Sequence, residues 1–510
     1  MRKRWFYQVC QQRFYVIVLM LVQLYILAGL IASTSRWSSE VLGLMNLVSV
    51  MAALRIISMQ EKTNYKLLWV FLFFLIPVFG GLMYLLVLWQ SSGKKVNLRL
   101  SELKEKSRGL LAGQKNLLSE DCVQEAGYLP LMRYLQNVGY PLYEHLESCY
   151  YPSGEQWFER LCQELKQAKR YIFLEYFIIQ EGTMWNTILD ILKCKAAEGV
   201  EVWVLYDDIG SLITLPKRYG DTLRSCGIRC RVFNPFRPVF STLQNNRDHR
   251  KITVIDGKTA FTGGINLADE YINLVDKYGH WKDSGILIKG PAVWQMVLLF
   301  LEMWNLAGER EEHPERFRPE QAGGTQIHGD GFVQPYGDCP VDGEHVGEHV
   351  YLHVITHAKS YVYINTPYLI VDDGMLSALS LAVKSGIDVR IITPHHWDKR
   401  IVHMTTRSYY RRLIAAGVRI YEYSSGFLHA KGIVSDDHVA VVGTTNLDYR
   451  SLYLHFECGV CLYENQTVLK VKEDFLDTLS RCQEIKEEDC KTGLIAEHFQ
   501  EMLHLFAPLM

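Results

Sequence analysis

The sequence predicts an α/β protein in which apolar N-terminal helices precede two repeated α/β domains. Each domain is expected to be a mixed sheet flanked by helices, and the two domains are expected to share one site. Three observations support this fold class. The first 93 residues contain long apolar segments, and an alternating strand and helix pattern begins near residue 151 and again near residue 348. Each copy also carries the same short motif, which indicates a duplicated domain within the 510 residues.

The N-terminal part carries three apolar segments. Residues 14–35 contain no charged side chain and are long enough to cross the roughly 30 Å hydrocarbon core as a helix. A signal peptide is the alternative, because small residues lie at Ala28–Ser33. A retained anchor is favoured because further apolar segments follow at Val41–Leu54 and Leu67–Trp89. We therefore expect residues 1–93 to form a membrane anchor with two to three transmembrane helices.

The positions of basic residues predict on which side of the membrane each part of the chain lies. The cluster after the third segment predicts that the rest of the chain is cytoplasmic, and it comprises Lys94, Lys95, Arg99, Lys104, Lys106 and Arg108. Arg2, Lys3 and Arg4 also favour the inside, and three crossings cannot place both clusters there. We expect a multi-pass protein of the cell membrane with cytoplasmic catalytic domains, and the number of crossings stays open.

The remainder divides into two copies of one plan. We expect a juxtamembrane tether at 94–150, a first domain at 151–317, a linker rich in Gly, Pro, Asp and Gln at 318–347, and a second domain at 348–510. The first copy predicts a parallel β-α-β unit with helices at Trp157–Arg170 and Met184–Ala197 and strands at Tyr171–Ile178 and Val200–Tyr206. The second predicts helices at His349–Lys359, Gly374–Lys384 and Lys399–Ala415 and strands at Tyr361–Asn365, Val389–Thr393 and Val418–Tyr423.

One motif occurs in both copies. His249 begins the first and His429 the second, and both read H-x-K-x-x-x-x-D. The match continues, because a glycine lies fourteen residues and an asparagine seventeen residues after each histidine: Gly263 and Asn266, Gly443 and Asn446. Two copies with the same four offsets are not expected by chance, so we interpret them as two halves of one site.

Each motif is expected to lie on a β-hairpin. In the first copy a strand at Arg250–Ile255 leads into the Asp256-Gly257 turn, and Lys258–Thr262 returns. In the second copy Ser435–His438 is the turn and Val439–Val442 returns. Residues two apart on a strand share a face, so the histidine and lysine of each motif point the same way.

These residue types suit the chemistry of a phosphodiester. One imidazole can attack phosphorus while the other protonates the leaving oxygen. Lys251 and Lys431 can stabilise the charge that spreads over the equatorial oxygens in the transition state. Asn266 and Asn446 can add hydrogen bonds, and the glycines allow a close approach of the backbone.

Carboxylates complete the candidate site. Asp283 and Glu457 occupy matching places before strands Gly285–Lys289 and Gly459–Tyr463, where each can orient a histidine. Asp256 and Asp436 are counted among the catalytic candidates, although both begin turns and a structural role is equally compatible with that position. The chemistry requires no metal and no other cofactor.

The cysteines point to no metal or redox site. Twelve are scattered along the chain, and Cys458 and Cys461 form the only C-x-x-C. That pair lies within an apolar run and has no second pair beside it, so we interpret it as part of a core strand.

These motifs resemble the phospholipase D superfamily, which is defined by paired H-x-K-x4-D motifs. Further stretches resemble bacterial cardiolipin synthases, namely Leu174–Phe177, Tyr206–Ser211, Asn365–Tyr368, Tyr421–Lys431, Gly443–Ser451 and the membrane segment Tyr65–Leu85. The resemblance covers about residues 40–510. This sequence departs from the family at Asp248 and His455, where Asn is common, and in the additional segment at residues 1–35.

The resemblance implies a phosphatidyltransferase whose partners are phosphatidylglycerol and membrane phospholipid. One histidine takes the phosphatidyl group as a phosphohistidine, glycerol leaves, and a second phosphatidylglycerol attacks to give cardiolipin. By resemblance His249 is the nucleophile and His429 the general acid and base; the residues alone do not order them.

Two other functions are alternatives for these motifs. A phospholipase D-type phosphodiesterase would use water to cut a phospholipid or a nucleic acid. A net charge of −2 and the apolar segments weigh against nucleic acid as a partner. A non-catalytic lipid-binding repeat would be expected to have lost a motif His or Lys, and all four are present. The sequence indicates no oligomeric state.

Overall fold

The computed structural model describes residues 36–59, 62–75, 92–111, 117–119, 127–144, 146–236, 242–319, 330–491 and 493–509. The apolar segment expected at residues 14–35 lies outside these residues, as do residues 76–89 of the third apolar segment.

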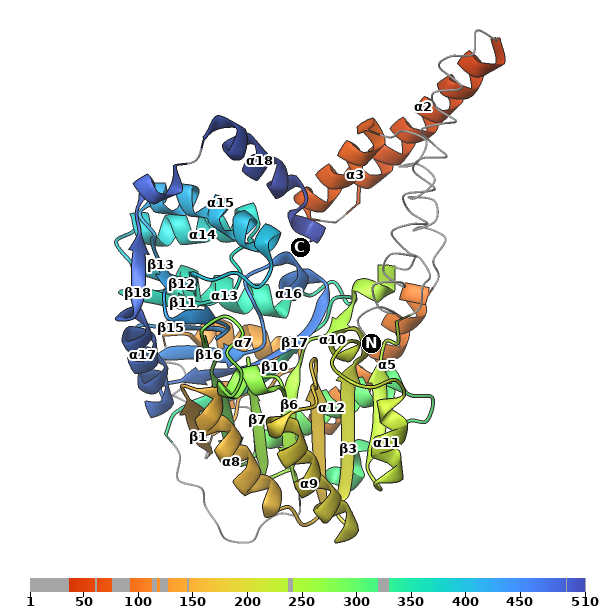
Figure 1. Cartoon of the computed structure of the whole chain (residues 1–510), viewed down its shortest axis with the longest axis vertical. Coiled ribbons are helices and arrows are strands. Elements are labelled where there is room, and N and C mark those ends of the chain that lie inside the picture. The colour runs from red at the N-terminus through yellow and green to blue at the C-terminus, as the bar shows by residue number, and fades with distance from the viewer. Residues whose placement is uncertain are drawn as a thin grey trace.

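A mixed seven-stranded sheet forms the centre of the first half (Figure 1). Its strands, in spatial order, are β1 (Glu147–Tyr151), β9 (Gly285–Lys289), β7 (Thr259–Gly263), β6 (Lys251–Ile255), β2 (Tyr171–Tyr176), β3 (Glu201–Asp207) and β4 (Arg229–Phe233). The pairs from β1 to β2 are antiparallel, and β2, β3 and β4 run parallel to one another.

The second half repeats this order. Its strands are β10 (Phe332–Asp338), β17 (His455–Tyr463), β16 (Val439–Gly443), β15 (Gly432–Ser435), β11 (Tyr361–Asn365), β12 (Asp388–Pro394) and β13 (Arg419–Tyr423), with β18 (Cys482–Ile485) added at the edge. Each neighbouring pair has the same relative direction as its counterpart in the first sheet. The expected duplication, both hairpins and both parallel β-α-β units are therefore confirmed.

Helices cover both sheets. Those of the first half are α8 (Gly154–Lys166), α9 (Thr183–Ala197), α10 (Asp208–Ser211), α11 (Tyr219–Ser225) and α12 (Val293–Ala307), with short 3-10 turns η2 (Thr242–Asn245), η3 (Asp269–Ile272) and η4 (Pro314–Phe317). Those of the second are α13 (Val346–His357), α14 (Asp373–Lys384), α15 (Arg400–Ala416), α16 (Tyr449–Tyr453), α17 (Gln466–Leu479) and α18 (Leu494–Leu505), with η5 (Glu487–Cys490) and η6 (Ala507–Leu509).

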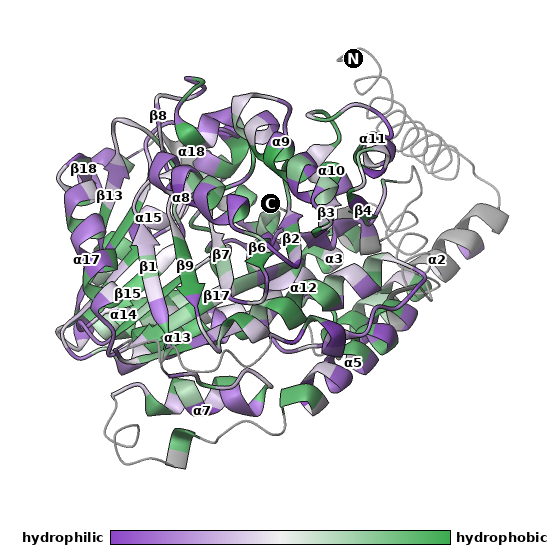
Figure 2. Ribbon diagram, turned by 90° about the horizontal axis from the view of Figure 1, so that it is seen from below, coloured by the Kyte–Doolittle hydropathy of each residue, from purple (hydrophilic) through white to green (hydrophobic). Residues whose placement is uncertain are grey.

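One helix joins the two halves into a single core. Residues 293–305 of α12 are all buried, which is expected of a helix that is apolar on every side and packed between other elements. Figure 2 shows α12 as a hydrophobic helix beside the strands of the sheets, while the outer helices carry hydrophilic faces. The largest apolar cluster runs without a break from the first sheet through α12 to the second sheet, so the halves are fixed relative to each other.

The segments expected to be a tether and a linker each contribute a strand to a sheet. Within 94–150, α5 (Ser92–Leu111) lies along α12, η1 (Leu117–Ser119) and α7 (Leu129–Asn137) follow, and β1 joins the first sheet. Within 318–347, β10 forms an edge strand of the second sheet. Sequence reasoning missed β10 because it contains Pro335 and Gly337, and an edge strand tolerates a proline that a central strand does not.

Two N-terminal helices project from the body beside the C-terminal helix α18 (Figure 1): α2 (Arg36–Ile57) and α3 (Thr63–Leu75). Lys62, just before α3, contacts the second half, because its Nζ lies 2.8 Å from Glu348 and 3.0 Å from Asp372. Among the residues that the model describes, no helix combines the length and the apolarity needed to span a membrane.

Candidate active site

The two halves exchange short strands at their junction. β5 (Arg247–Asp248), just before the first motif, pairs with the start of β17 in the other half. In the same way β14 (Gly426–Leu428), just before the second motif, pairs with β8 (His280–Lys282). The backbone N–H of His249 then donates to Phe456 O, and that of His429 donates to Lys282 O. Each histidine is therefore fixed to the opposite half of the chain.

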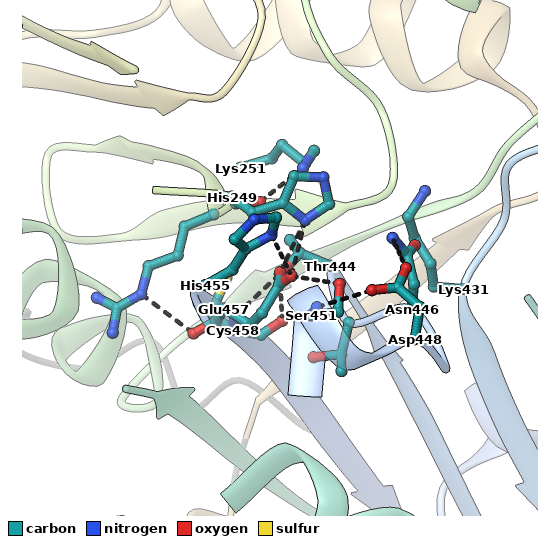
Figure 3. Close-up of polar contacts among 12 residues, drawn as sticks. His249, Lys251, Lys431, Thr444, Asn446, Asp448, Ser451, His455, Glu457 and Cys458 are labelled. Atoms are coloured by element: carbon teal, nitrogen blue, oxygen red, sulfur yellow. Dashed lines mark hydrogen bonds and ion pairs between the residues drawn. The ribbon is translucent and has the colours of Figure 1, made fainter. Parts of the chain in front are cut away.

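Because of this exchange, each motif histidine pairs with a carboxylate of the other half. His249 Nδ1 lies 2.8 and 3.0 Å from the two carboxylate oxygens of Glu457, as Figure 3 shows. His429 Nδ1 lies 2.6 Å from Asp283 Oδ2. A neutral imidazole that donates through Nδ1 carries its lone pair on Nε2, so both histidines are prepared to act through Nε2.

Both orienting carboxylates are held in place by their surroundings. Glu457 accepts hydrogen bonds from Thr444 Oγ1 at 2.5 Å and from Ser451 Oγ at 2.7 Å. Asp283 accepts from the N–H of Ser284 at 2.8 Å and lies against Gly264, where an added Cβ would be 2.0 Å from Asp283 Oδ1. Only glycine fits at position 264 without displacing this carboxylate.

The motif lysines lie beside their own histidines. Lys251 Nζ donates to His249 O at 2.6 Å, and Lys431 Nζ contacts His429 O and lies 2.7 Å from His429 Nδ1. Both are buried, and burial lowers the pKa of Lys251 to about 8 and that of Lys431 to about 7. A bound phosphate would favour the charged form of both, because an opposite charge nearby raises the pKa of an ammonium group.

The surroundings of both histidines favour the neutral imidazole. Burial, followed by the charge of Lys251, lowers the pKa of His249 well below its ordinary value. Burial and Lys431 lower the pKa of His429 to about 4, while Asp283 opposes this shift. Lys431 also lowers the pKa of His249, and Lys251 that of His429, which places the two motifs in one electrostatic environment.

The motif aspartates lie at the other end of the hairpins. Asp256 accepts from the backbone N–H groups of Lys169, Arg170 and Tyr171 at 2.7–3.0 Å. Asp436 does the same for residues 359–361, which lowers its pKa in spite of burial. They are not brought to the histidines, and their contacts define a structural role: each ties its turn to the start of the neighbouring strand.

The asparagines and glycines also make mainly structural contacts. Asn266 accepts from Ile178 N at 3.0 Å and donates to Tyr271 Oη at 2.7 Å, whereas Asn446 donates to Asp448 Oδ2 at 3.2 Å and leaves its buried Oδ1 unpaired. At Gly263 and Gly443 an added Cβ would be 2.5 Å from backbone of the adjacent strand. These two glycines therefore allow strands to pack closely.

Several neighbours were not singled out by sequence reasoning. Arg250 is buried and donates to the backbone of Glu457, Leu299 and Asp338, which ties the first motif to the second sheet. Thr444 and Ser451 lie in a stretch that resembles the family, but their role in holding Glu457 depends on the fold. Cys458 and Cys461 lie buried on β17, as expected for a core strand.

This architecture defines the class of the protein. Two repeated α/β halves that meet at a site of paired histidines and lysines constitute a phospholipase D-like protein. Residues 161–304 and 351–479 match the family model described as cardiolipin synthase, PLD-like domain, and residues 47–87 match the model described as Phospholipase_D-nuclease N-terminal. The chain belongs to the cardiolipin synthase family with phospholipase D-like domains.

Similar proteins agree with this membership. The chain is 35% identical over 472 residues to a cardiolipin synthase of Alkalihalophilus pseudofirmus, and the aligned part covers 92% of each protein. It is 44% identical over 387 residues, 74% of this chain and 82% of the other, to an uncharacterized protein of Streptococcus mutans. A crystal structure of phosphatidylserine synthase from Haemophilus influenzae superposes with a TM-score of 0.56 at 18% identity, covering 75% of this chain and 98% of that one, which bears on the fold alone.

Proposed function

We propose that this protein is a cardiolipin synthase that transfers a phosphatidyl group from one phosphatidylglycerol to another. The observation that carries the chemistry is the crossed pairing of His249 with Glu457 and of His429 with Asp283. It presents two neutral imidazoles, oriented from opposite halves, beside two lysines whose charged form a bound phosphate would favour. The similarity to cardiolipin synthases over nine-tenths of the chain supports the lipid substrate.

In the first step, His249 Nε2 attacks the phosphorus of phosphatidylglycerol. The bond from phosphorus to the glycerol oxygen breaks, and His429 gives a proton to that oxygen, so glycerol leaves; the negative charge of the bound phosphodiester and Asp283 favour the protonated form of His429 that this step needs. In the second step the head-group hydroxyl of another phosphatidylglycerol attacks phosphorus. His429 takes the hydroxyl proton, the bond from phosphorus to His249 breaks, and cardiolipin forms. Lys251 and Lys431 stabilise the charge on the phosphoryl oxygens in both steps.

The surroundings of the two histidines support one order of action. The nucleophile must be unprotonated, and the burial and positive neighbours of His249 lower its pKa well below the ordinary value. The general acid must gain a proton, and Asp283 favours protonation of His429. These differences support His249 as nucleophile and His429 as acid and base.

The experiment is lipid extraction from cells that produce the wild type or His249→Ala. Cardiolipin should accumulate with the wild type only, and mass spectrometry identifies it. The purified wild type should convert phosphatidylglycerol into cardiolipin and glycerol. If it releases phosphatidic acid instead, water is the acceptor and the alternative phosphodiesterase function holds. If neither product forms, including after addition of phosphatidylethanolamine, the proposal is wrong.

We also propose that the N-terminal apolar segments hold the enzyme in the cell membrane with the catalytic halves in the cytoplasm. Glu105 is exposed on α5, just after these segments. A cysteine introduced as Glu105→Cys should resist a membrane-impermeant thiol reagent in intact cells and react after permeabilisation. The chain without this cysteine gives the background from its native thiols. Labelling from outside would contradict the cytoplasmic placement.

A further inference from the structure

A third imidazole lies beside the proposed nucleophile. The ring centroid of His455 is 5.5 Å from that of His249, with 43° between the rings, and Figure 3 shows the two side chains with Glu457. One ring nitrogen of each histidine and one oxygen of Glu457 all lie within 4.8 Å of one another. His455 thus reaches the site from the start of β17, two residues before the orienting carboxylate.

The repeat shows that this position is built to face a catalytic histidine. His455 pairs with Arg247, two residues before His249, and its counterpart Trp281 pairs with Phe427, two residues before His429. The ring of Trp281 lies 5.4 Å from that of His429, with 48° between them. This strand position therefore places a ring against the catalytic imidazole in both halves, and in the half that faces His249 that ring is polar.

His455 has no hydrogen-bond partner within the described residues. Both ring nitrogens are inaccessible to solvent and unpaired, although Nδ1 is 3.9 Å from Glu457 Oε1. A neutral imidazole has one N–H donor and one acceptor, and leaving a buried donor unpaired is destabilising. Such a group inside a reaction site calls for a ligand that completes its hydrogen bonds.

The surrounding charges indicate the kind of ligand. Burial and the positive charges of Arg450, Lys251 and Arg247 lower the pKa of His455 well below its ordinary value. His249, His455 and Glu457 offer a donor set that suits a divalent metal ion. The same positive neighbours repel a metal cation and attract an anion, so an anionic ligand is favoured.

We propose that His455 is a phosphate-binding residue, whose ring N–H donates to a non-bridging oxygen of the phosphoryl group at His249. This inference rests on the proposed function, because that function brings a phosphoryl group to His249. His455 would act together with Lys251, whose positive charge acts on the His455 ring. An asparagine at this position would also carry an N–H donor, so His455→Asn preserves donation.

The test measures binding of inorganic phosphate to the purified full chain by calorimetry, at pH 6.5 and before any lipid is added. His455→Ala and His455→Phe should each weaken phosphate binding by about 10–100-fold, the usual contribution of a hydrogen bond to a charged group. His455→Phe retains an aromatic ring but no donor, so it separates packing from donation. His455→Asn should bind within about threefold of the wild type, because its amide restores the donor.

His438→Asn is the matched control, since His438 is exposed and pairs with Glu464 on the turn of the second hairpin. It should bind phosphate as the wild type does, and thermal melting checks that every variant is folded. Equal phosphate binding by the wild type, His455→Ala and His455→Phe would overturn the proposal. Micromolar Zn²⁺ binding that His455→Ala abolishes, with phosphate binding unchanged, would replace it by a metal site.

Turnover of phosphatidylglycerol separates this inference from the function on which it rests. In His455→Ala the KM for phosphatidylglycerol should rise, and His455→Asn should restore it. A wild type that makes no cardiolipin refutes the proposed function, whereas a wild type that makes it, with His455→Ala unchanged in KM and kcat, refutes the role of His455 alone.

Discussion

Replacing Glu457 by glutamine tests the crossed geometry of the site. Glu457 belongs to the second half, yet its oxygens lie 2.8 and 3.0 Å from Nδ1 of His249 in the first half. The amide of Glu457→Gln keeps the size and one acceptor oxygen but removes the negative charge. Burial raises the pKa of Glu457, but Lys251 and the positive imidazole ring that forms when His249 attacks phosphorus favour its charged form, and that charge in turn stabilises the ring.

The loss of turnover expected in Glu457→Gln follows from the interaction between the carboxylate and the positive imidazole ring. Two unit charges about 4 Å apart interact by about 4 kcal/mol at an effective dielectric constant of about 20. The neutral hydrogen bond that glutamine can still accept is worth about 1 kcal/mol. The difference of about 3 kcal/mol corresponds to a kcat about a hundredfold lower. KM should change little, because the charge forms only in the transition state.

The assay combines turnover of phosphatidylglycerol with NMR of the histidine ring nitrogens. In Glu457→Gln the signals of His249 should move and those of His429 should stay, while Asp283→Asn should give the converse. Glu464→Gln is the matched control, because Glu464 pairs with His438 on the surface. If Glu457→Gln shifts the His429 signals and spares those of His249, or leaves kcat unchanged, the crossed pairing is refuted.

Two further predictions concern the lysines and the turns. Because burial lowers the pKa of Lys251 to about 8 and of Lys431 to about 7, the free enzyme loses these positive charges as the pH rises through 7–8. We therefore expect kcat/KM to fall on the alkaline side of that range, while kcat holds to higher pH because bound phosphate favours the charged lysines; a flat kcat/KM profile up to pH 9.5 would contradict this. Asp256→Ala should lower the free energy of unfolding by about 1–3 kcal/mol, because it leaves three backbone N–H groups without their acceptor, and Asp436→Ala should match it. Denaturant unfolding measures this loss, and a folded Asp256→Ala protein without activity would show that Asp256 has a catalytic role after all.

The local elements of both halves could be read from the sequence. The two hairpins, the parallel strands and the helices α8, α9, α13, α14 and α15 follow from hydrophobic periodicity and turn residues, and these signals depend only on near neighbours in the chain, whereas the central helix α12 was not predicted. The repeated His and Lys identified the site for the same reason, since residues two apart on a strand share a face. Where a local signal was weak, prediction failed: β10 contains Pro335, and its strand conformation depends on pairing with β17.

Contacts between distant residues were decided by the tertiary structure alone. The sequence placed Asp283 and Glu457 correctly in matching positions but did not assign either to a particular histidine. The assignment follows from the exchange of β5 and β14 between the halves, which carries each histidine to the carboxylate of the other half. The same exchange brings His455 to His249, 206 residues away in the chain. The sequence by itself thus determined which residue types supply the chemistry, and the packing of the two sheets decided which of them act together, because that depends on strand pairing across the whole chain.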